Sequence, residues 1–300
     1  MKGHTSTQPK VWGAVEKHRV TSISVVGDPF AKPMLRVLDE NPGRYDLSSL
    51  AGMSSSGAMF TEEVKDGLIN HAPALVITDS FASTEAMGMG VSTASKDGHV
   101  KTADFQLTEY AIVIDENDNR VGAGESGLVA FGGPQPLGYY KDEAKTAKTF
   151  RHRSKATRFV VPGDFARVEQ DGSVTLLGRG SNCINTAGEK VFPEEVEEAL
   201  KTHASVEDAL VLGVPDEKWG QAVTGVVVLS PGASFDEADL RTHVRGQLAG
   251  YKTPKRILIA GVNLRAPNGK ADYKAVGEFA RRELGGRVVL ILRQAQDDDM

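Results

Sequence analysis

Two basic residues beside glycines are the best candidates for chemistry on an anionic substrate. Lys270 ends a Pro-Asn-Gly-Lys turn, which presents an amine on an exposed loop. Arg179 lies between two glycines, which let the backbone bend while the guanidinium donates to a ribose or a phosphate. Most lysines are solvated surface residues, so neither pattern is specific alone. The specific signal is the long ordered segment Gly178–Glu197, which contains this arginine.

A hydroxyl-rich segment with one carboxylate, Ser80–Glu85, follows the branched apolar run Leu75–Asp79. A hydroxyl beside a carboxylate at the end of a strand can hold a phosphate together with Mg²⁺. The same composition is typical of a plain Ser/Thr-rich turn. The residues alone leave both interpretations open.

Three further features carry weaker signals. Asp164 precedes a predicted hairpin, where a carboxylate either satisfies turn amides or accepts hydrogen bonds from a ribose diol. The segment Gly122–Gly127 fits the dinucleotide pattern GxGxxG, but a hairpin turn precedes it and a strand follows, so we expect a plain loop. Cys183 is expected to be a small core residue rather than a nucleophile.

Composition limits the classes of function. The chain has 300 residues, 40% of them hydrophobic, and a formal net charge of −5. This acidic balance argues against a nucleic-acid partner or a membrane surface. We find no apolar run near the ~18 residues of a transmembrane helix and no apolar secretion signal after Met1. A cytoplasmic protein is expected, and its oligomeric state, including a homo-oligomer, stays open.

Hydrophobic periodicity predicts an α/β sheet first, then a β-rich segment and a small α+β unit. In parallel sheets ligands collect at the carboxyl ends of the strands, which places Ser54–Ala58 and Ser80–Glu85 where a site can form. The predicted helices are 11–18, 30–39, 62–71, 194–201 (opened by Pro193), 236–248 and 273–284. The predicted strands are 22–26, 50–54, 75–79, 110–114, 127–131, 165–168, 174–177, 209–212 and 223–229.

Taken in order, these segments resemble the adenylate-forming (AMP-binding) superfamily, in its acyl-CoA synthetase or fatty-acid–CoA ligase branch. The resemblance runs from about Val11 to Leu284. It rests on Asp46–Leu50, Ser56–Ala58, Ser80–Glu85, Gly122–Gly127, Pro162–Asp164, Gly178–Glu197 and Gly269–Lys270.

The resemblance implies an incomplete N-terminal adenylation domain at 1–178 and a C-terminal lid domain at 179–286. The remaining segment, 287–300, is an atypical tail. Within it Val288–Leu292 would form an extra edge strand, or the whole tail is an appended extension.

The resemblance also implies a nucleotide site. Ser56, Gly57 and Ala58 would lie along the adenine, with Phe81 stacked on it. Thr84 would contact the α-phosphate, Glu85 would bind Mg²⁺, and Asp164 and Arg179 would hold the ribose. The remaining nucleotide-binding residues would be Asp79, Ser80, Ala82 and Ser83.

The implied reaction joins a carboxylic acid, fatty or sterol-derived, to CoA at the expense of ATP. Lys270 would stabilise charge as the acyl-adenylate forms, acting with Thr84 and Glu85 as the catalytic residues. After pyrophosphate leaves, the lid would rotate about Ser181 and bring Ala187 and Gly188 to the site for CoA.

The chain departs from the family pattern in three ways. Ser181 replaces the usual aspartate or lysine of the hinge, and Ala82 and Ala187 stand where glycine is usual. The glycine-rich phosphate loop of the family would lie upstream of Val11, so a truncated enzyme with impaired activity is expected. The alternatives are a non-catalytic nucleotide-binding or interaction module that needs a separate N-terminal half, or a fragment without a stable fold.

Overall fold

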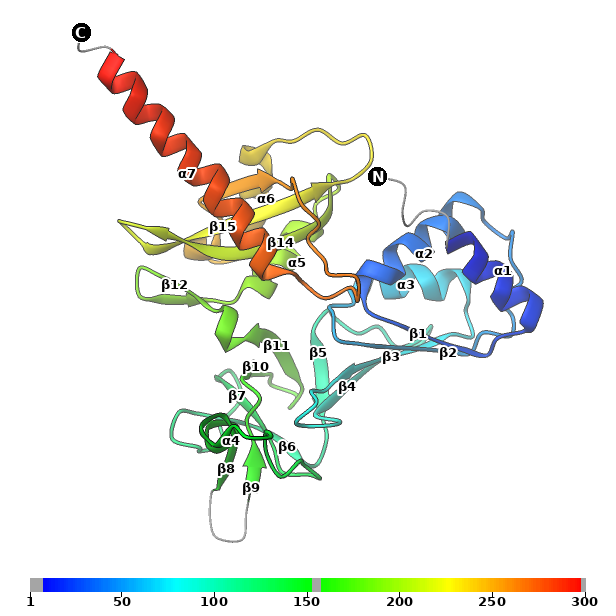
Figure 1. The fold of residues 1–300 in the computed structure, drawn as a ribbon. Helices are drawn as coiled ribbons and strands as arrows, with labels where there is room; N and C mark the ends of the chain where they lie inside the picture. Colours follow the sequence, from blue (N-terminus) through cyan, green and yellow to red (C-terminus); the bar gives the residue numbers. More distant parts are fainter. Residues whose placement is uncertain (1–7, 153–157, 298–300) are drawn as a thin grey trace. The chain divides into compact units, whose positions relative to one another are not determined.

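The computed structural model describes residues 8–152 and 158–297. The chain folds into two compact units, the N-terminal unit Met1–Leu177 and the C-terminal unit Gly178–Met300 (Figure 1). Among the described residues, no helix combines the length and the apolar character needed to cross a bilayer.

Three parallel strands and three helices form the first half of the N-terminal unit. β1 pairs with β2, and β2 with β3, so all three strands end at the same edge. The antiparallel strands β4 and β5 extend the sheet beyond β3. The elements are α1 (Gln8–His18), β1 (Ser22–Val25), α2 (Asp28–Glu40), β2 (Gly52–Ser56), α3 (Glu62–His71), β3 (Val76–Phe81), β4 (Gly90–Ala94) and β5 (Asp104–Leu107).

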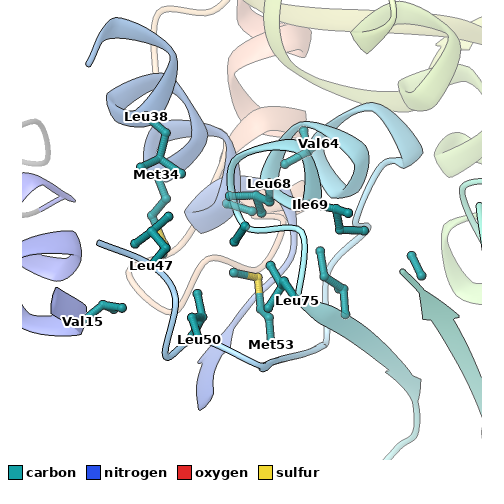
Figure 2. Close-up of a cluster of buried hydrophobic side chains, with 14 of the residues drawn as sticks. Val15, Met34, Leu38, Leu47, Leu50, Met53, Val64, Leu68, Ile69 and Leu75 are labelled. Atoms are coloured by element: carbon teal, nitrogen blue, oxygen red, sulfur yellow. The ribbon is translucent and has the colours of Figure 1, made fainter. Parts of the chain in front are cut away.

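The helices pack on one face of this sheet. α2 places Met34 and Leu38 on its buried side, and α3 places Val64 and Leu68 on its own, at the spacing of one helical face. These side chains meet Met53 of β2 in one apolar cluster (Figure 2). Burial of each such side chain stabilises the fold by about 1.5–3 kcal/mol.

The opposite face of the sheet carries short polar side chains. Ser54 of β2 is exposed, lies beside Thr78 of β3 in the strand register, and has its Oγ 2.6 Å from that of Ser24. Thr93 of β4 is also exposed and pairs with Thr78. Parallel sheets are usually covered on both faces. In the described part of the chain, this face stays accessible.

The second half of the N-terminal unit is antiparallel. β7 pairs with β6, β9 and β10, and β11 joins β10 to β5, which makes one eleven-stranded sheet. The predicted hairpin turn between β10 and β11 is present, with Gly172 at φ +87°. The elements are β6 (Ala111–Ile114), β7 (Ser126–Phe131), α4 (Glu143–Thr149), β8 (Phe150–His152), β9 (Arg158–Val160), β10 (Asp164–Val168) and β11 (Val174–Arg179).

The C-terminal unit has a five-stranded sheet between two layers of helices. Alternate residues of β14 face opposite clusters: Ala209 and Val211 pack with α5 and α6, whereas Leu210 packs with α7. The elements are two 3-10 turns (Gly180–Asn182 and Gly250–Lys252), β12 (Ile184–Thr186), β13 (Glu189–Val191), α5 (Pro193–Lys201), β14 (Val206–Asp216), β15 (Gly220–Leu229), α6 (Glu237–Gln247), β16 (Arg256–Ile259) and α7 (Tyr273–Asp297).

The predicted fold class is confirmed, and one prediction about the tail is wrong. α7 continues as a helix through Asp297, so Val288–Leu292 is not an edge strand. Two glycines interrupt the sequence before this run, but each weakens a helix by only ~1 kcal/mol, and no proline follows Tyr273. The apolar run therefore extends the helix that precedes it.

A glycine at the β1–α2 junction fixes the loop that follows β2. Gly27 has φ +53°, and a Cβ there would lie 2.3 Å from the Met59 carbonyl oxygen and 2.7 Å from that of Ala58. The next residue, Asp28, donates its backbone N–H to the Met59 oxygen over 2.9 Å. The backbones of the two loops are thus in direct contact.

We predict that Gly27→Ala destabilises the chain by at least ~2 kcal/mol, because the methyl group adds a backbone clash to left-handed strain. Gly43→Ala is the matched control, since Gly43 also has positive φ (+71°) but nothing within 4 Å of its Cβ position. Urea denaturation measures both variants. Equal losses of stability would contradict the proposed contact.

The turn between β12 and β13 has two residues in the left-handed region. Ala187 has φ +52° and Gly188 φ +88°, the pattern of a type I′ hairpin. Glycine accepts this conformation readily, but alanine is strained in it by about 1 kcal/mol or more. The Ala187 N–H donates to the Trp219 carbonyl over 2.9 Å, which holds the hairpin in place.

Ala187→Gly is therefore expected to leave stability unchanged or raise it by up to ~1 kcal/mol, because relief of strain offsets the greater freedom of the unfolded chain. Ala249 is exposed, has φ −54° and serves as the control. Ala249→Gly should lower stability by ~0.5–1 kcal/mol. A similar drop in thermal stability for both variants would contradict the strain at Ala187.

Candidate active site

The two segments predicted to bind a nucleotide lie side by side at the carboxyl ends of parallel strands. The register of β2 and β3 pairs Ser56 with Ser80. Ser56 and Gly57 are exposed, and Ala58 is half-buried. The structure thus brings together groups that are 24 positions apart in the sequence.

Buried polar residues beneath this strand edge hold its loops by hydrogen bonds. The Thr61 N–H donates to Asp28 Oδ1 over 2.9 Å, and the Gly27 N–H donates to Ser55 Oγ over 3.2 Å. Asp79 and Lys65 are almost completely buried. Burial raises the pKa of Asp79, and the charge of Lys65 opposes that rise. Asp79 thus lies under the strand edge rather than on its surface.

Thr84 and Glu85 occupy the tip of a tight turn. The backbones of Ser83 and Ala86 exchange hydrogen bonds of 3.0 and 3.2 Å, and Ser83 Oγ accepts from the Ala86 N–H over 3.1 Å. Thr84 is exposed and Glu85 is half-buried. The sequence left open whether this segment is a plain Ser/Thr-rich turn or a ligand site. The segment is a turn, and its accessible tip leaves room for a ligand as well.

The aromatic residue before this turn is mostly inside the protein. Phe81 is 7% exposed and packs against Phe105, with ring centroids 5.8 Å apart. Ala82 and Ser83, which follow it, are half-buried. Stacking of Phe81 on an adenine stays a prediction.

Tyr139 is a residue of this region that the sequence analysis missed. Its hydroxyl donates to Glu85 Oε1 over 2.5 Å. The two residues are 54 positions apart, so no local pattern pointed to the pair. Only the long-range fold brings this phenol to the carboxylate.

Asp164 comes from a different part of the N-terminal unit. It is the first residue of β10, is 6% exposed, and follows Gly163, which has φ +100°. Because β10 pairs with β7 and β11, the strand register does not place it next to Ser80. The contact of Asp164 with a ribose stays a prediction.

Arg179 and Ser181 lie at the start of the C-terminal unit. Arg179 ends β11, Ser181 lies in the 3-10 turn that follows, and both are exposed. Gly178 has φ +127°, a conformation that favours glycine, and a Cβ there would lie 2.1 Å from a carboxylate oxygen of Glu194. Burial raises the pKa of the nearby Cys183 thiol, which disfavours a reactive thiolate there.

Lys270 is exposed on a short closed loop. Its carbonyl accepts from the Ala266 N–H over 2.9 Å, and its own N–H donates to Asn268 Oδ1 over 3.1 Å. Arg265 and Ala271 form an antiparallel bridge at the base of the loop. The backbone of the loop is therefore fixed, while the lysine side chain extends from an exposed position.

Polar contacts on either side of this loop anchor it to β14 and to α5. Arg265 donates two hydrogen bonds to Asp208, of 2.9 and 2.7 Å. On the other side, the Tyr273 hydroxyl donates to Glu197 Oε1 over 2.9 Å. Burial raises the pKa of Glu197 and also that of Tyr273. Neither Arg265 nor Tyr273 was among the predicted site residues.

The Ala187–Gly188 hairpin and the base of the Lys270 loop lie at opposite ends of β15. The hairpin is held at the start of the strand, where Thr186 pairs with Gly220. Arg265 binds Asp208, which pairs with Val228 near the end of the strand. Eight residues of extended strand separate these points, or about 27 Å. The two segments therefore do not form one site within the C-terminal unit.

Comparisons with known proteins agree with these features. Residues 1–140 match the family described as AMP-binding enzyme, and residues 195–270 match the AMP-binding enzyme C-terminal domain. These ranges include the strand-edge segments and Lys270, but not Asp164 or Arg179.

Curated relatives include a 3-oxocholest-4-en-26-oate–CoA ligase of Rhodococcus rhodochrous, 46% identical over 88% of this chain and 49% of that protein. A medium/long-chain-fatty-acid–CoA/3-oxocholest-4-en-26-oate–CoA ligase of Mycobacterium tuberculosis is 44% identical over 88% and 48%, respectively. The chain thus spans about half the length of these relatives.

Among solved structures, the anthranilate CoA ligase AuaEII in complex with anthranoyl-AMP matches with a TM-score of 0.78. The match covers 93% of this chain and 54% of that one at 22% identity, which supports the fold alone. The two family matches and the related ligases place the chain in the AMP-binding enzyme family.

Proposed function

We propose that this chain is the C-terminal part of an ATP-dependent acyl-CoA synthetase. Such an enzyme converts a carboxylic acid, ATP and CoA to acyl-CoA, AMP and pyrophosphate through an acyl-adenylate. The observation that carries the proposal is the placement of Lys270 and Ala187–Gly188 at opposite ends of β15. Two chemical steps at one nucleotide site would use these two ends in turn.

The nucleotide would lie on the strand edge of the N-terminal unit. Ser56 and Gly57 are exposed there, and Ser80, the strand partner of Ser56, is half-buried, which leaves room for a flat base. Asp164 would accept hydrogen bonds from the ribose hydroxyls, and Arg179 would donate to the same ribose. The remaining nucleotide-binding residues would be Asp79, Phe81, Ala82 and Ser83.

Mg²⁺ would be held next to the α-phosphate by Glu85. Glu85 suits a hard cation, because it supplies carboxylate oxygens, is half-buried and lies on an accessible turn. When bound, the cation would neutralise phosphate charge. Thr84 would hold the α-phosphate by a hydrogen bond and so orient it for attack by the acid.

In the first step the carboxylate of the acid attacks the α-phosphorus, and pyrophosphate leaves. The Lys270 ammonium would stabilise the negative charge that develops on the transferring oxygens. The lid would then turn about Ser181 and exchange Lys270 for the Ala187–Gly188 hairpin. In the second step the CoA thiolate attacks the acyl carbon, and AMP leaves.

The substrate class is proposed from the related ligases. Their names specify medium- and long-chain fatty acids and a sterol-derived acid. We therefore propose a fatty or sterol-derived acid as the substrate of this chain. We also propose a cytoplasmic location.

The accessible face of the β1–β4 sheet favours a second candidate, a nucleotide-binding module that pairs with a separate N-terminal half. Ser54, Thr78 and Thr93 are small enough to let helices of another polypeptide approach this face closely. Such a module would bind AMP without turnover until its partner is added.

Separate assays of the two half-reactions test the main proposal. With a medium-chain acyl-AMP and CoA, wild type and Lys270→Ala should form thioester at similar rates. The rate of ATP-dependent adenylation, measured by ATP–pyrophosphate exchange, should be at least ~100-fold lower in Lys270→Ala than in wild type. The substitution removes a group that stabilises the developing negative charge.

Lys274→Ala is the control, since Lys274 is another exposed lysine four positions away. It should leave both half-reactions unchanged. Equal loss of both half-reactions in Lys270→Ala would contradict the exchange of the two lid ends. AMP binding without thioester formation in wild type would favour the second candidate.

A further inference from the structure

The phenol of Tyr139 reaches a carboxylate on a turn that has little support from regular structure. Its hydroxyl donates to Glu85 Oε1 over 2.5 Å, a short distance typical of a bond to an ionised acceptor. Glu85 lies at the tip of the Ser83–Ala86 turn, outside any helix or strand. A long-range contact is therefore well placed to fix the orientation of its carboxylate.

Tyr139 is itself held firmly by the segment that follows it. Its N–H donates to Thr146 Oγ1 over 2.9 Å. Its ring packs edge-on against Phe150 at 5.6 Å, and Lys145 Nζ lies 3.9 Å from the ring centre. A Cβ at Gly138 would lie only 2.5 Å from Thr146 Cγ2, so the chain passes close to α4 at this point.

The next residue, Tyr140, is also a tyrosine but has different surroundings. Tyr140 is 88% exposed, whereas Tyr139 is half-buried. Two adjacent residues of the same type thus differ in their surroundings. This difference supplies a control with identical chemistry.

We propose that Tyr139 is a positioning residue that sets the orientation of Glu85 for Mg²⁺. The inference rests on the proposed function, in which Glu85 binds the cation. The phenol donates its proton in a hydrogen bond and leaves the carboxylate ionised, so it orients the ligand without neutralising it. A hydrogen-bond partner behind a ligand tunes metal affinity in this way at many metal sites.

The first test compares Tyr139→Phe with Tyr140→Phe in the whole chain. Mn²⁺ binding in the presence of ATP is followed by electron paramagnetic resonance, with Mn²⁺ as the probe for Mg²⁺. Tyr139→Phe should weaken Mn²⁺ binding by ~10-fold or more, and Tyr140→Phe should not change it. Equal affinities of wild type and Tyr139→Phe would overturn the proposal.

A double-mutant cycle shows whether Tyr139 acts through Glu85. In a Glu85→Gln background, Tyr139→Phe should produce no further loss of Mn²⁺ affinity. A full additional ~10-fold loss in that background would mean that Tyr139 acts by another route, and would overturn the proposal.

Hydrogen exchange separates this proposal from the proposed function, because it needs no ligand. Amides of residues 81–90 should exchange roughly 10-fold faster in Tyr139→Phe than in wild type or Tyr140→Phe, since a bond to a charged group is lost. Unchanged exchange would contradict the positioning role. If wild type binds no Mn²⁺–ATP while the exchange result holds, the metal function fails and the anchoring of Glu85 stands.

Discussion

β15 separates the two segments of the C-terminal unit that are proposed to act in turn. Its hydrogen bonds to β12, β14 and β16 fix the backbone along its length. The Ala187–Gly188 hairpin is tied to one end, and Arg265 ties the base of the Lys270 loop towards the other. Because a packed sheet does not bend by tens of ångströms, the two segments cannot approach a common ligand together. A whole-unit movement is the simplest way in which both could serve one site.

The N-terminal unit meets a different physical requirement, which is to keep polar groups at a strand edge in fixed positions. Asp28, Lys65 and Asp79 are nearly buried, although desolvation of charged groups is unfavourable. Hydrogen bonds and the opposite charges of these groups offset part of that loss. The apolar cluster of Figure 2 supplies much of the remaining stability. As a result of this packing, the loop after β2 and the turn after β3 are held at the same edge of the sheet.

Local patterns in the sequence predicted much of this architecture. Helix α3 occupies the predicted residues 62–71, because its apolar spacing matches one helical face. Pro193 opens α5 as expected, since its missing N–H is not needed at a first helical position. The short strands β4, β5, β8, β9, β12, β13 and β16 were not predicted, because three to five residues carry little periodicity. The tail was misjudged because its branched apolar run suits a strand as well as a helix.

The site could be predicted only where its residues are close in sequence. Ser80–Glu85 and Gly178–Glu197 are continuous segments, so their composition was informative. The contacts of Tyr139 with Glu85 and of Tyr273 with Glu197 join residues 54 and 76 positions apart. Such pairs depend on the packing of distant segments in the fold, which no local pattern encodes.

The most direct test of the account is a pair of spin-label distances between the two units. One label is placed at Met87→Cys beside the Glu85 turn, in a Cys183→Ser background. A second label is placed either at Asn268→Cys in the Lys270 loop or at Glu189→Cys beside the hairpin. We expect the distance to position 268 to be shorter with an acyl-sulfamate analogue of the acyl-adenylate than with AMP and CoA. We expect the distance to position 189 to be shorter with AMP and CoA than with the analogue. Distances that do not change between these ligands, or that change together in the same direction, would contradict it.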